Sequence, residues 1–380
     1  MKFFGIDNPS FDPESNSHLI IYILSLLDNR TRDSSVFVSK EWNKLVNLTK
    51  KYLDLLPTIH RVPLFKTAGL DVLRLKLLAG GMTNNTYRVG LQSNPEQWVL
   101  RIPGIGSSAF ITRENEDHNA HQAEKLGLNV PIVFFDPIDG LQVTSFIPDI
   151  KNIDSEALER KDILSTVAKL LHSLHSSPPF LNNTSFFERN EDLLNVLKKK
   201  QFSFNDDISF IEKHMLDLKS LFNAYPIEMH PCHNDATPLN FIMSFEGSRD
   251  DKKEKIHIID WEYSSNNHIL WDLVYFSVEA KLNKQQELFL LNSYFGEKLT
   301  KTILAWFELY KPIITWWITI WSWSQLANKA NAVELTSYEK LGKENCQKTL
   351  TYLNSEEYTD AFQSVAEEKE MAKATGHSPF

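Results

Sequence analysis

Two short segments of the chain carry side chains that could do chemistry. The first places Asp235 five residues before Asn240, and the second places Asp260 at the end of an apolar run. Carboxylate and carboxamide oxygens are ligands that Mg²⁺ prefers, and a further carboxylate can orient a hydroxyl and accept its proton. Phosphoryl transfer needs little else from a protein. The spacing therefore predicts a kinase of a small alcohol, with Asp235 as base and with Asn240 and Asp260 as metal ligands.

Two neighbouring residues have the character of supports for this centre. His233 stands two residues before Asp235 and is better suited to organise the loop than to act as a base. Asp272 follows Asp260 by twelve residues, and we expect it to accept hydrogen bonds from the loop backbone instead of touching a ligand. Each carboxylate taken alone fits a helix cap or a surface charge. Their combination at this spacing, after an apolar strand, favours a catalytic centre.

A glycine pair earlier in the chain has the composition of a phosphate-binding turn. Gly80 and Gly81 precede Thr83 and Asn84 between two predicted strands. Paired glycines let the backbone turn tightly and approach phosphate oxygens, to which backbone N–H groups and a Thr hydroxyl can donate. Taken alone, this pattern favours an ordinary hairpin turn. The later segments are what favour assigning these four residues to ATP binding.

A cation and a carboxylate complete the expected nucleotide site. Arg101 lies in an apolar run, and a buried cation needs a partner. Glu116, in a helix predicted to begin near Arg113, is the candidate partner, because kinases fix the nucleotide phosphates with a strand cation paired to a helix carboxylate. The alternative is that this acidic helix presents a solvated face, which is the better interpretation for Glu114 and Asp117.

The composition permits such an enzyme and argues against other classes. The 380 residues are 42% apolar, and their net charge of −9 disfavours a general nucleic-acid binder, which needs clustered Lys and Arg. Two cysteines, Cys232 and Cys346, cannot form a secreted disulfide framework. The apolar stretch at the start is too short, before charged residues and Pro9, for a signal peptide. The stretch 313–323 is too short to span a bilayer and fits a buried helix. We therefore expect a cytoplasmic protein without a transmembrane segment.

Hydrophobic periodicity divides the chain into three parts and a tail. Residues 16–56 show helical spacing in two patterns, separated by the polar stretch 28–33. A strand-rich part follows, interrupted by one helix at about 113–126, and the chain is mostly helical from residue 154. Strands are expected at residues 73–78, 86–89, 98–102, 241–243 and 257–259. The predicted domains are a helical module, 1–62, a β-rich lobe, 63–147, a helical lobe, 148–355, and a charged tail, 356–380.

These segments occur in the order seen in choline/ethanolamine kinases, and the chain resembles the bacterial type of that family over roughly residues 65–355. The resemblance implies an α+β fold of the bilobal, protein-kinase-like type found in aminoglycoside phosphotransferases, with ATP and Mg²⁺ between the lobes. It implies that Asp235 is the base, that Asn240 and Asp260 bind Mg²⁺, and that Arg101 pairs with Glu116. The matching stretches are 80–84, 100–104, 113–116, 233–240 and 259–263. Leu239 departs from the family, whose members often have Glu immediately before the loop Asn.

Substrate choice is expected to lie in the aromatic C-terminal half. A quaternary ammonium cannot donate a hydrogen bond, so its recognition depends on aromatic faces and one or two carboxylates, at about 0.5–2 kcal/mol per aromatic contact. Trp321 stands four residues before Gln325, as in the family's choline site, and Tyr263, Glu279 and Tyr338 also match positions of that site. The resemblance therefore favours choline as the acceptor and ethanolamine second, with an aminoglycoside or a protein hydroxyl as lesser possibilities.

The other tryptophans of this half are harder to assign. The second Trp of the family's pair is out of register, because Trp317 lies one position away from it. Tryptophans at helical spacing are more commonly core residues, and this is the favoured interpretation for Trp316 and Trp323.

The N-terminal part poses a separate question. The apolar stretch 18–27 and the stretch 36–45, which contains Trp42, resemble an F-box, the module that binds the small adaptor of cullin-type ubiquitin ligases. The Leu-Pro start of that motif is absent. A helical cap packed on the kinase lobe is an alternative that the sequence favours equally. With an F-box, a bacterial-type kinase would be a protein delivered into a host-cell cytosol. The rival hypothesis is thus an adaptor or effector whose kinase-like body binds a target without phosphorylating a small molecule.

Overall fold

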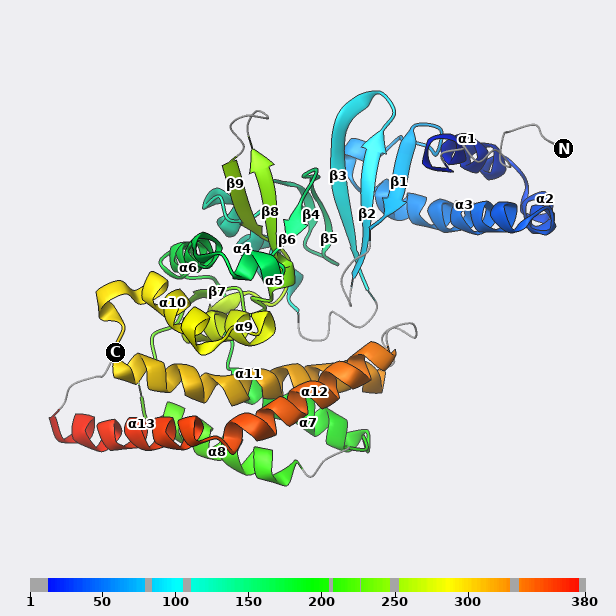
Figure 1. Cartoon of the computed structure of the whole chain (residues 1–380). Helices are drawn as coiled ribbons and strands as arrows, with labels where there is room; N and C mark the ends of the chain where they lie inside the picture. Colours follow the sequence, from blue (N-terminus) through cyan, green and yellow to red (C-terminus); the bar gives the residue numbers. More distant parts are fainter. Residues whose placement is uncertain are drawn as a thin grey trace. The chain divides into compact units, whose positions relative to one another are not determined.

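The computed structural model describes residues 13–78, 84–104, 111–204, 208–225, 227–246, 253–328 and 335–375 of the chain (Figure 1). These residues form two compact units. The first unit consists of residues within 1–102, 132–135 and 141–146, and the second consists of residues within 103–131, 136–140 and 147–380. Within the described residues, no helix has both the length and the apolar character needed to cross a bilayer.

Short polar caps shape the helices at the start of the first unit. The Asp28 carboxylate accepts the N–H of Thr31 at 3.0 Å, and buried Arg32 donates to the carbonyl of Leu24 at 2.8 Å. The polar stretch 28–33, expected as a gap between two helical patterns, is therefore itself helical, because Asp28 caps it and Arg32 binds the end of the preceding helix. These elements are α1 (Pro13–Ser25), α2 (Asn29–Ser34), the 3-10 helix η1 (Ser35–Phe37) and α3 (Lys40–Ile59).

A five-stranded sheet with the order β1-β2-β3-β5-β4 completes the first unit. The antiparallel register of β1 and β2 places Leu75 opposite Val89, and both side chains are buried. The strands are β1 (Leu73–Leu77), β2 (Asn84–Leu91), β3 (Asn94–Pro103), β4 (Ile132–Asp136) and β5 (Leu141–Ser145). The strands predicted at 73–78, 86–89 and 98–102 correspond to β1, β2 and β3.

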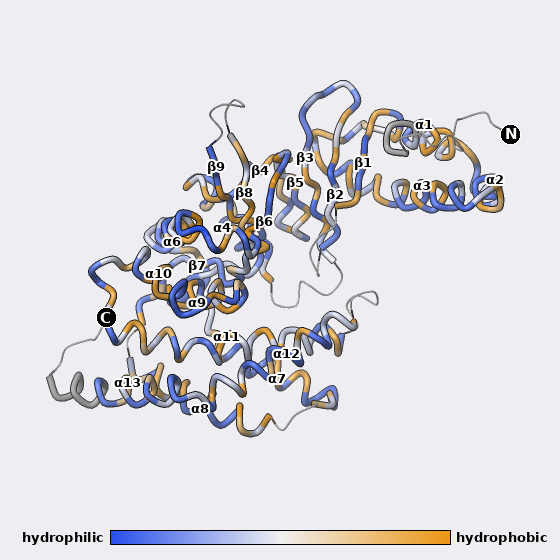
Figure 2. The backbone as a smooth tube through the Cα atoms, viewed as in Figure 1, coloured by the Kyte–Doolittle hydropathy of each residue, from blue (hydrophilic) through white to orange (hydrophobic). Residues whose placement is uncertain are grey.

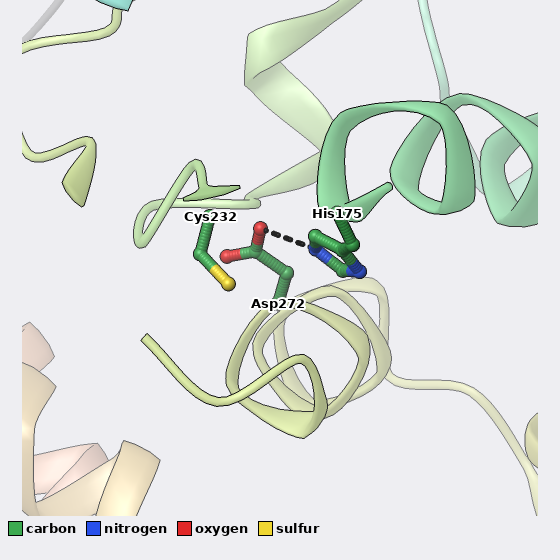
Figure 3. Close-up of side chains that lie close together, drawn as sticks. All are labelled: His175, Cys232 and Asp272. Atoms are coloured by element: carbon green, nitrogen blue, oxygen red, sulfur yellow. Dashed lines mark hydrogen bonds and ion pairs between the residues drawn. The ribbon is translucent and has the colours of Figure 1, made fainter. Parts of the chain in front are cut away.

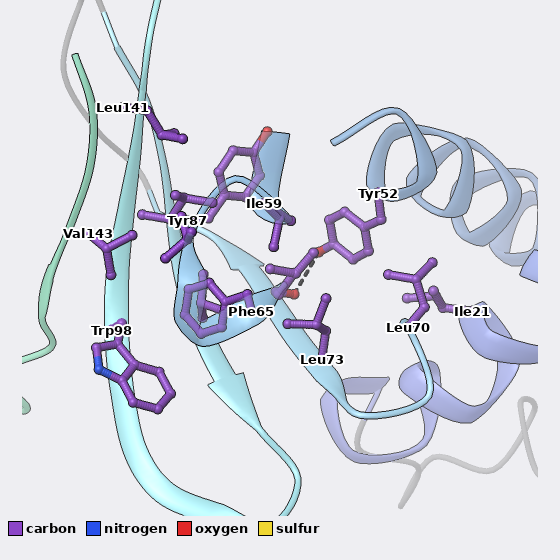
Figure 4. Close-up of a cluster of buried hydrophobic side chains, with 14 residues drawn as sticks. Ile21, Tyr52, Ile59, Phe65, Leu70, Leu73, Tyr87, Trp98, Leu141 and Val143 are labelled. Atoms are coloured by element: carbon purple, nitrogen blue, oxygen red, sulfur yellow. Dashed lines mark hydrogen bonds between the residues drawn. The ribbon is translucent and has the colours of Figure 1, made fainter. Parts of the chain in front are cut away.

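Helix α3 packs its apolar face on this sheet. Hydrophobic and hydrophilic residues alternate along α3 (Figure 2), as expected for a helix with one buried side. Tyr52 and Ile59 of this helix join Phe65 and Tyr87 in one buried cluster (Figure 4). The Tyr52 hydroxyl donates to the carbonyl oxygen of Leu75 at 2.7 Å. Helix α3 and the sheet therefore share a hydrophobic core.

The second unit is mostly helical and contains two small sheets. One sheet has the order β6-β8-β9, and β7 pairs with β10 in the other. The strands are β6 (Lys151–Asn152), β7 (His230–Cys232), β8 (Phe241–Glu246), β9 (Lys253–Ile258) and β10 (Ser265–Asn267). The helices are α4 (Arg113–Lys125), α5 (Ser155–Leu158), α6 (Lys161–His175), α7 (Phe186–Lys199), α8 (Ser209–Phe222), α9 (Leu270–Ala280), α10 (Lys284–Phe295), α11 (Lys301–Asn328), α12 (Leu335–Leu353) and α13 (Glu356–Thr375). The strands expected at 241–243 and 257–259 fall in or beside β8 and β9.

Helix α11 lies in the core of the second unit. It contacts α7, α9, α12 and α13, and most of its residues between Trp306 and Gln325 are buried. The stretch 313–323 is thus part of a buried helix, as its sequence indicates. Trp316 and Trp323 pack edge to face with ring centroids 5.9 Å apart, and both are core residues. The predicted domain limits at residues 62, 147 and 355 remain predictions.

Candidate active site

The strand pair β8 and β9 brings the two chemical segments together. Asn240 immediately precedes β8, and Asp260 follows β9 by two residues. Antiparallel pairing of Phe241 with Ile258 therefore aligns the two ends, and the N–H of Ile259 donates to the carbonyl oxygen of Asn240 at 2.9 Å. The pairing of β8 with β9 therefore brings together two residues that lie twenty positions apart in the sequence.

Asp235 and Asn240 are directly hydrogen-bonded. The Asn240 Nδ2 donates to the backbone oxygen of Asp235 at 2.9 Å and to its Oδ2 at 3.0 Å. Because Nδ2 is used in this way, Oδ1 is the ligand atom that Asn240 can offer to a cation. Asp260 adopts a left-handed backbone conformation, with φ of 66°, at the end of its strand. Such a conformation is uncommon for a residue other than glycine and is frequent at functional sites.

The electrostatics of this pair fit a hard divalent cation. Burial raises the pKa of Asp235, His233 and a hydrogen bond from Tyr275 oppose this shift, and the charge of Asp260 adds to it. Asp260 thus lies close enough to Asp235 for their like charges to interact. The carboxylate of Asp260 and the side-chain oxygen Oδ1 of Asn240 are the ligand types that hold Mg²⁺. The charge of the ion would offset the repulsion between the two carboxylates.

Asp272 accepts hydrogen bonds from the loop that precedes Asp235, and Figure 3 draws its carboxylate beside His175 and Cys232. Its Oδ2 accepts the N–H of His233 at 2.7 Å, and its Oδ1 accepts the N–H of Asn234 at 2.8 Å. His175 Nε2 donates to the same carboxylate at 3.1 Å, and its Nδ1 accepts the hydroxyl of Tyr294 at 2.7 Å. Asp272 is fully buried, so all these bonds are shielded from water. The two residues that precede Asp235 are therefore fixed through their main chain.

The side chain of His233 adds a second support. Its Nδ1 accepts the N–H of Asp235 at 3.3 Å, and its Nε2 donates to the carbonyl oxygen of Ile259 at 2.9 Å. The ring also packs edge to face on Trp261, with centroids 4.8 Å apart. With both nitrogens committed to the backbone, the imidazole links the loop to the segment that carries Asp260.

Cys232, His175 and Asp272 form a buried cluster of potential metal ligands, the one such cluster of His, Cys and acidic residues found in the described part of the chain. Both Asp272 oxygens accept N–H groups of the loop. Burial raises the pKa of the Cys232 thiol well above its usual range, and the thiol is directed to the carbonyl oxygen of Asn267 at 3.5 Å. These bonds indicate a structural cluster, because a metal ion would have to replace them.

The expected nucleotide residues are only partly described. Gly80, Gly81 and Thr83 lie outside the described residues, and Asn84 begins β2. The two remaining members, Arg101 and Glu116, belong to different units, and their pairing stays a prediction. Within the second unit, the Glu116 carboxylate binds the guanidinium of Arg113, which also reaches Glu262 at 3.4 Å.

Tyr263, Trp317, Trp321 and Tyr338 form a set of contacting rings, here named the aromatic cluster. Trp321 Nε1 donates to the Tyr263 hydroxyl at 2.9 Å, and the Trp321 and Tyr338 rings meet edge to face at 5.8 Å. The Tyr263 and Trp317 rings do the same at 6.2 Å. The structure thus brings together four residues that lie up to 75 positions apart in the chain.

The aromatic cluster is tied to the catalytic loop. The Asn234 side chain donates to the carbonyl oxygen of Tyr263 at 3.1 Å, and Tyr263 follows Asp260 by three residues. Glu279 of helix α9 adds a carboxylate whose pKa burial raises; Lys348 opposes that shift and Asp235 adds to it. Asp235 therefore lies within electrostatic reach of Glu279.

Sequence reasoning missed two residues at this site. Tyr275 of helix α9 hydrogen-bonds the Asp235 carboxylate, and Arg189 of helix α7 lies over the Trp317 ring with its Cζ 3.7 Å from the centroid. Tyr275 lies four residues before Glu279, on the same helix face. Arg189 sits beside the apolar stripe of its helix, where a cation is ordinarily solvated, so periodicity alone carries no signal for it.

A base candidate, two candidate oxygen ligands and an aromatic cluster lie in the second unit, which is the composition expected of a phosphotransferase site. The family model for choline/ethanolamine kinases matches residues 75–294, more than half of the chain. The chain belongs to this family.

Individual relatives agree with this assignment. Protein LicA of Haemophilus influenzae is 32% identical over 221 residues, which cover 57% of this chain and 61% of that relative. A choline/ethanolamine kinase family protein of Mesorhizobium loti has a similar crystal structure, with a TM-score of 0.68 and 26% identity over 82% of this chain and 98% of that one. The choline kinase LicA of Streptococcus pneumoniae, at 22% identity, shares the fold with a TM-score of 0.63 over 77% of this chain and 98% of that one. The chain thus spans about three-fifths of the length of the Haemophilus relative.

The predicted fold class is confirmed. An aminoglycoside phosphotransferase bound to gentamicin shares the fold, with a TM-score of 0.54 and 16% identity over 79% of this chain and 96% of that one. The α+β, protein-kinase-like architecture follows from this likeness and from the two kinase structures above.

Proposed function

We propose that this protein transfers the γ-phosphoryl group of ATP, in a Mg²⁺-dependent reaction, to the hydroxyl of a small amino-alcohol. Choline is the favoured acceptor and ethanolamine is second. The observation that carries the proposal is the position of Asp235 between the candidate metal ligands and the candidate acceptor site. On one side it is bonded to Asn240 and influenced by Asp260, and on the other it is bonded to Tyr275, beside the aromatic cluster.

The roles of the residues follow from this arrangement. Asp235 accepts the proton of the acceptor hydroxyl and orients its oxygen, because it is the carboxylate common to both sides of the site. Asn240 and Asp260 would hold Mg²⁺, which supplies neutralisation of the phosphate charge. Asp272 and His233 keep the loop backbone in place, so that Asp235 does not need to be reoriented in each cycle.

The preference for choline rests on the aromatic cluster. Trp321 and Tyr263 are partly exposed, and Tyr338 is buried with its ring edge to face on Trp321. Exposed ring surfaces attract a quaternary ammonium that cannot donate hydrogen bonds, and the partly exposed Glu279 is a carboxylate of the same unit. The streptococcal protein with this fold is named as a choline kinase, in agreement with the proposal. An ethanolamine ammonium would also be attracted to the rings, but it carries hydrogen-bond donors that need partners.

The decisive experiment measures ATP consumption by the full-length protein against choline, ethanolamine and related amino-alcohols, with and without Mg²⁺. The substitution Asp235→Asn should lower kcat by about 10²–10⁴-fold, because the base is lost while the side-chain volume is kept. Asp162→Asn, at an exposed carboxylate that binds Arg160, is the matched control and should leave the rate unchanged. Asp235→Asn with the rate of the unaltered protein would contradict the proposal.

The adaptor hypothesis retains one observation in its favour. Leu26, Phe37 and Val38 in the N-terminal helical region are 68%, 89% and 65% exposed, so apolar side chains are accessible there. The comparisons with known proteins do not support an F-box partner. If the protein were only an adaptor, Asp235→Asn would keep its cellular effect, and the protein would co-purify with the ligase adaptor.

A further inference from the structure

The start of helix α4 contributes to a buried charged triad. The guanidinium of Arg113 binds Oε2 of Glu116, one turn further along the helix, and its Nη1 lies 3.4 Å from Oε2 of Glu262. These three side chains are 4%, 1% and 2% exposed, respectively. Two carboxylates therefore face one cation away from water, and the cation offsets a repulsion that burial strengthens.

The third member of the triad belongs to the segment that begins at the candidate metal ligand Asp260. Glu262 follows Asp260 by two residues, and the segment 260–264 lies between β9 and β10 without belonging to either strand. The left-handed backbone of Asp260, with φ of 66°, costs energy and persists only where the surroundings hold it. Contacts to this segment are therefore what keep the Asp260 carboxylate in place.

Helix α4 holds the far end of the same segment. The Asn119 Nδ2 donates to the carbonyl oxygen of Ser264 at 3.0 Å and to its Oγ at 3.1 Å. The Ser264 hydroxyl in turn donates to the carbonyl oxygen of Trp261 at 2.6 Å. Residues 113, 116 and 119 are buried and three positions apart, so they share one face of the helix. This face binds the segment at two points, one of them charged.

Gly140 leaves space for the arginine of the triad. A β-carbon at this position would lie 2.6 Å from Cδ and 2.7 Å from Nε of Arg113, well inside the separation of non-bonded atoms. The Arg113 side chain therefore passes directly over the backbone of residue 140. Any larger residue at this position would displace the guanidinium from its two carboxylates without removing its charge.

We propose that Arg113 is a positioning residue of the phosphotransferase reaction, which bridges Glu116 and Glu262 and thereby fixes the segment 260–264 with the candidate Mg²⁺ ligand Asp260. This inference rests on the proposed function and names a support of its metal site. The guanidinium is engaged by the two carboxylates, so it acts through the segment and not on the reacting groups. A triad that served only the stability of the fold would leave Mg²⁺ binding unchanged.

The substitution Arg113→Met removes the cation and leaves two buried carboxylates unpaired. Calorimetric titration of the full-length protein with Mg²⁺, at saturating ADP and without acceptor, should show an affinity about 10–100-fold weaker, as for other supports of metal ligands. Binding of choline, measured without nucleotide, should be unchanged. Arg113→Lys keeps the charge without the guanidinium plane and should give an intermediate loss. Arg160→Met is the control, because Arg160 also binds two carboxylates, Asp162 and Glu254, but at the surface.

The substitution Gly140→Ala tests the same contact with every charge retained. Its β-carbon should displace Arg113 and weaken Mg²⁺ binding in the same direction as Arg113→Met. Gly127→Ala is the matched control, because Gly127 has a similar φ of 73° but a β-carbon there would meet no atom within 4 Å. Both substitutions carry the backbone cost of a positive φ. Equal effects of the two on Mg²⁺ affinity would overturn the inference, since backbone strain alone would then explain them.

Hydrogen exchange of peptides that cover residues 259–266 gives a readout independent of activity. Both Arg113→Met and Gly140→Ala should exchange faster there and not in helix α11. If Asp260→Asn abolishes Mg²⁺ binding and neither variant changes it, the positioning role fails and the kinase stands.

If Asp260→Asn leaves Mg²⁺ affinity unchanged, the metal assignment of the proposed function fails. Hydrogen exchange then decides the inference: faster exchange in residues 259–266 supports it, and unchanged exchange overturns it. Thermal unfolding shows whether each variant is folded, and Gly140→Ala and Arg113→Lys serve if Arg113→Met is not.

Discussion

The substitution Asp272→Asn tests whether the catalytic loop is positioned through its backbone. Asp272 does not reach the reacting groups but accepts N–H groups of His233 and Asn234 at 2.7 and 2.8 Å and that of His175 at 3.1 Å. The asparagine has nearly the same volume, so packing is kept. It has one acceptor oxygen in place of two, and its amide nitrogen is itself a donor.

The expected cost follows from these bonds. At least one backbone N–H loses its acceptor in a fully buried site, at about 1–3 kcal/mol, and the remaining bonds lose the strength that the negative charge gives them. Together, these losses should lower the free energy of unfolding by about 3–5 kcal/mol, because three hydrogen bonds to a charged acceptor are lost or weakened at once. A displacement of Asp235 by about 1 Å should reduce kcat about 10²-fold.

Urea unfolding and steady-state kinetics of the same preparation give both quantities. Asp162→Asn, on the exposed start of helix α6, is the matched control for loss of a carboxylate. If Asp272→Asn unfolds at the same urea concentration as the unaltered protein and keeps its kcat, the backbone bonds do not position the loop. If stability falls but kcat does not, Asp272 supports the fold and Asp235 is oriented by other contacts.

Two further predictions concern Trp321 and His268. Trp321→Ala should raise the KM for choline by about 2–30-fold, corresponding to about 0.5–2 kcal/mol of cation–π attraction, with the KM for ATP unchanged; an unchanged choline constant would remove this residue from the acceptor site. Burial lowers the pKa of His268 from 6.5 to about 3, so the folded protein binds its proton less tightly than the unfolded chain does. Its contribution to stability is therefore present above pH 6.5 and is lost as the pH falls toward 3, at about 1.4 kcal/mol per pH unit. His268→Gln should flatten this part of the stability profile in denaturation at a series of pH values, and an unchanged slope would show that other groups cause it.

The local spacing of apolar residues was sufficient to predict much of the secondary structure. The alternating apolar residues of β1 and β2 and the helical spacing of α3 appear in the folded protein where the sequence indicates them, because each element buries one side. The sequence predicts a gap at 28–33, because its polar residues show no helical spacing of apolar side chains. The stretch is nevertheless helical, since the Asp28 cap and the hydrogen bonds of Arg32 stabilise it. Capping bonds of this kind depend on geometry that periodicity does not contain.

The spacing in the sequence by itself predicted that Asp235, Asn240 and Asp260 belong to one site. The pairing of β8 with β9 places their segments side by side, and their shared role in catalysis stays a prediction. Only the tertiary structure decided which rings meet, since Tyr263, Trp321 and Tyr338 come from separate elements. It also decided that Arg189 stacks on Trp317 with two unsatisfied donors. A cation beside an apolar helix stripe is equally compatible with solvent and with a ligand site, and the choice depends on the neighbouring helix that packs against it.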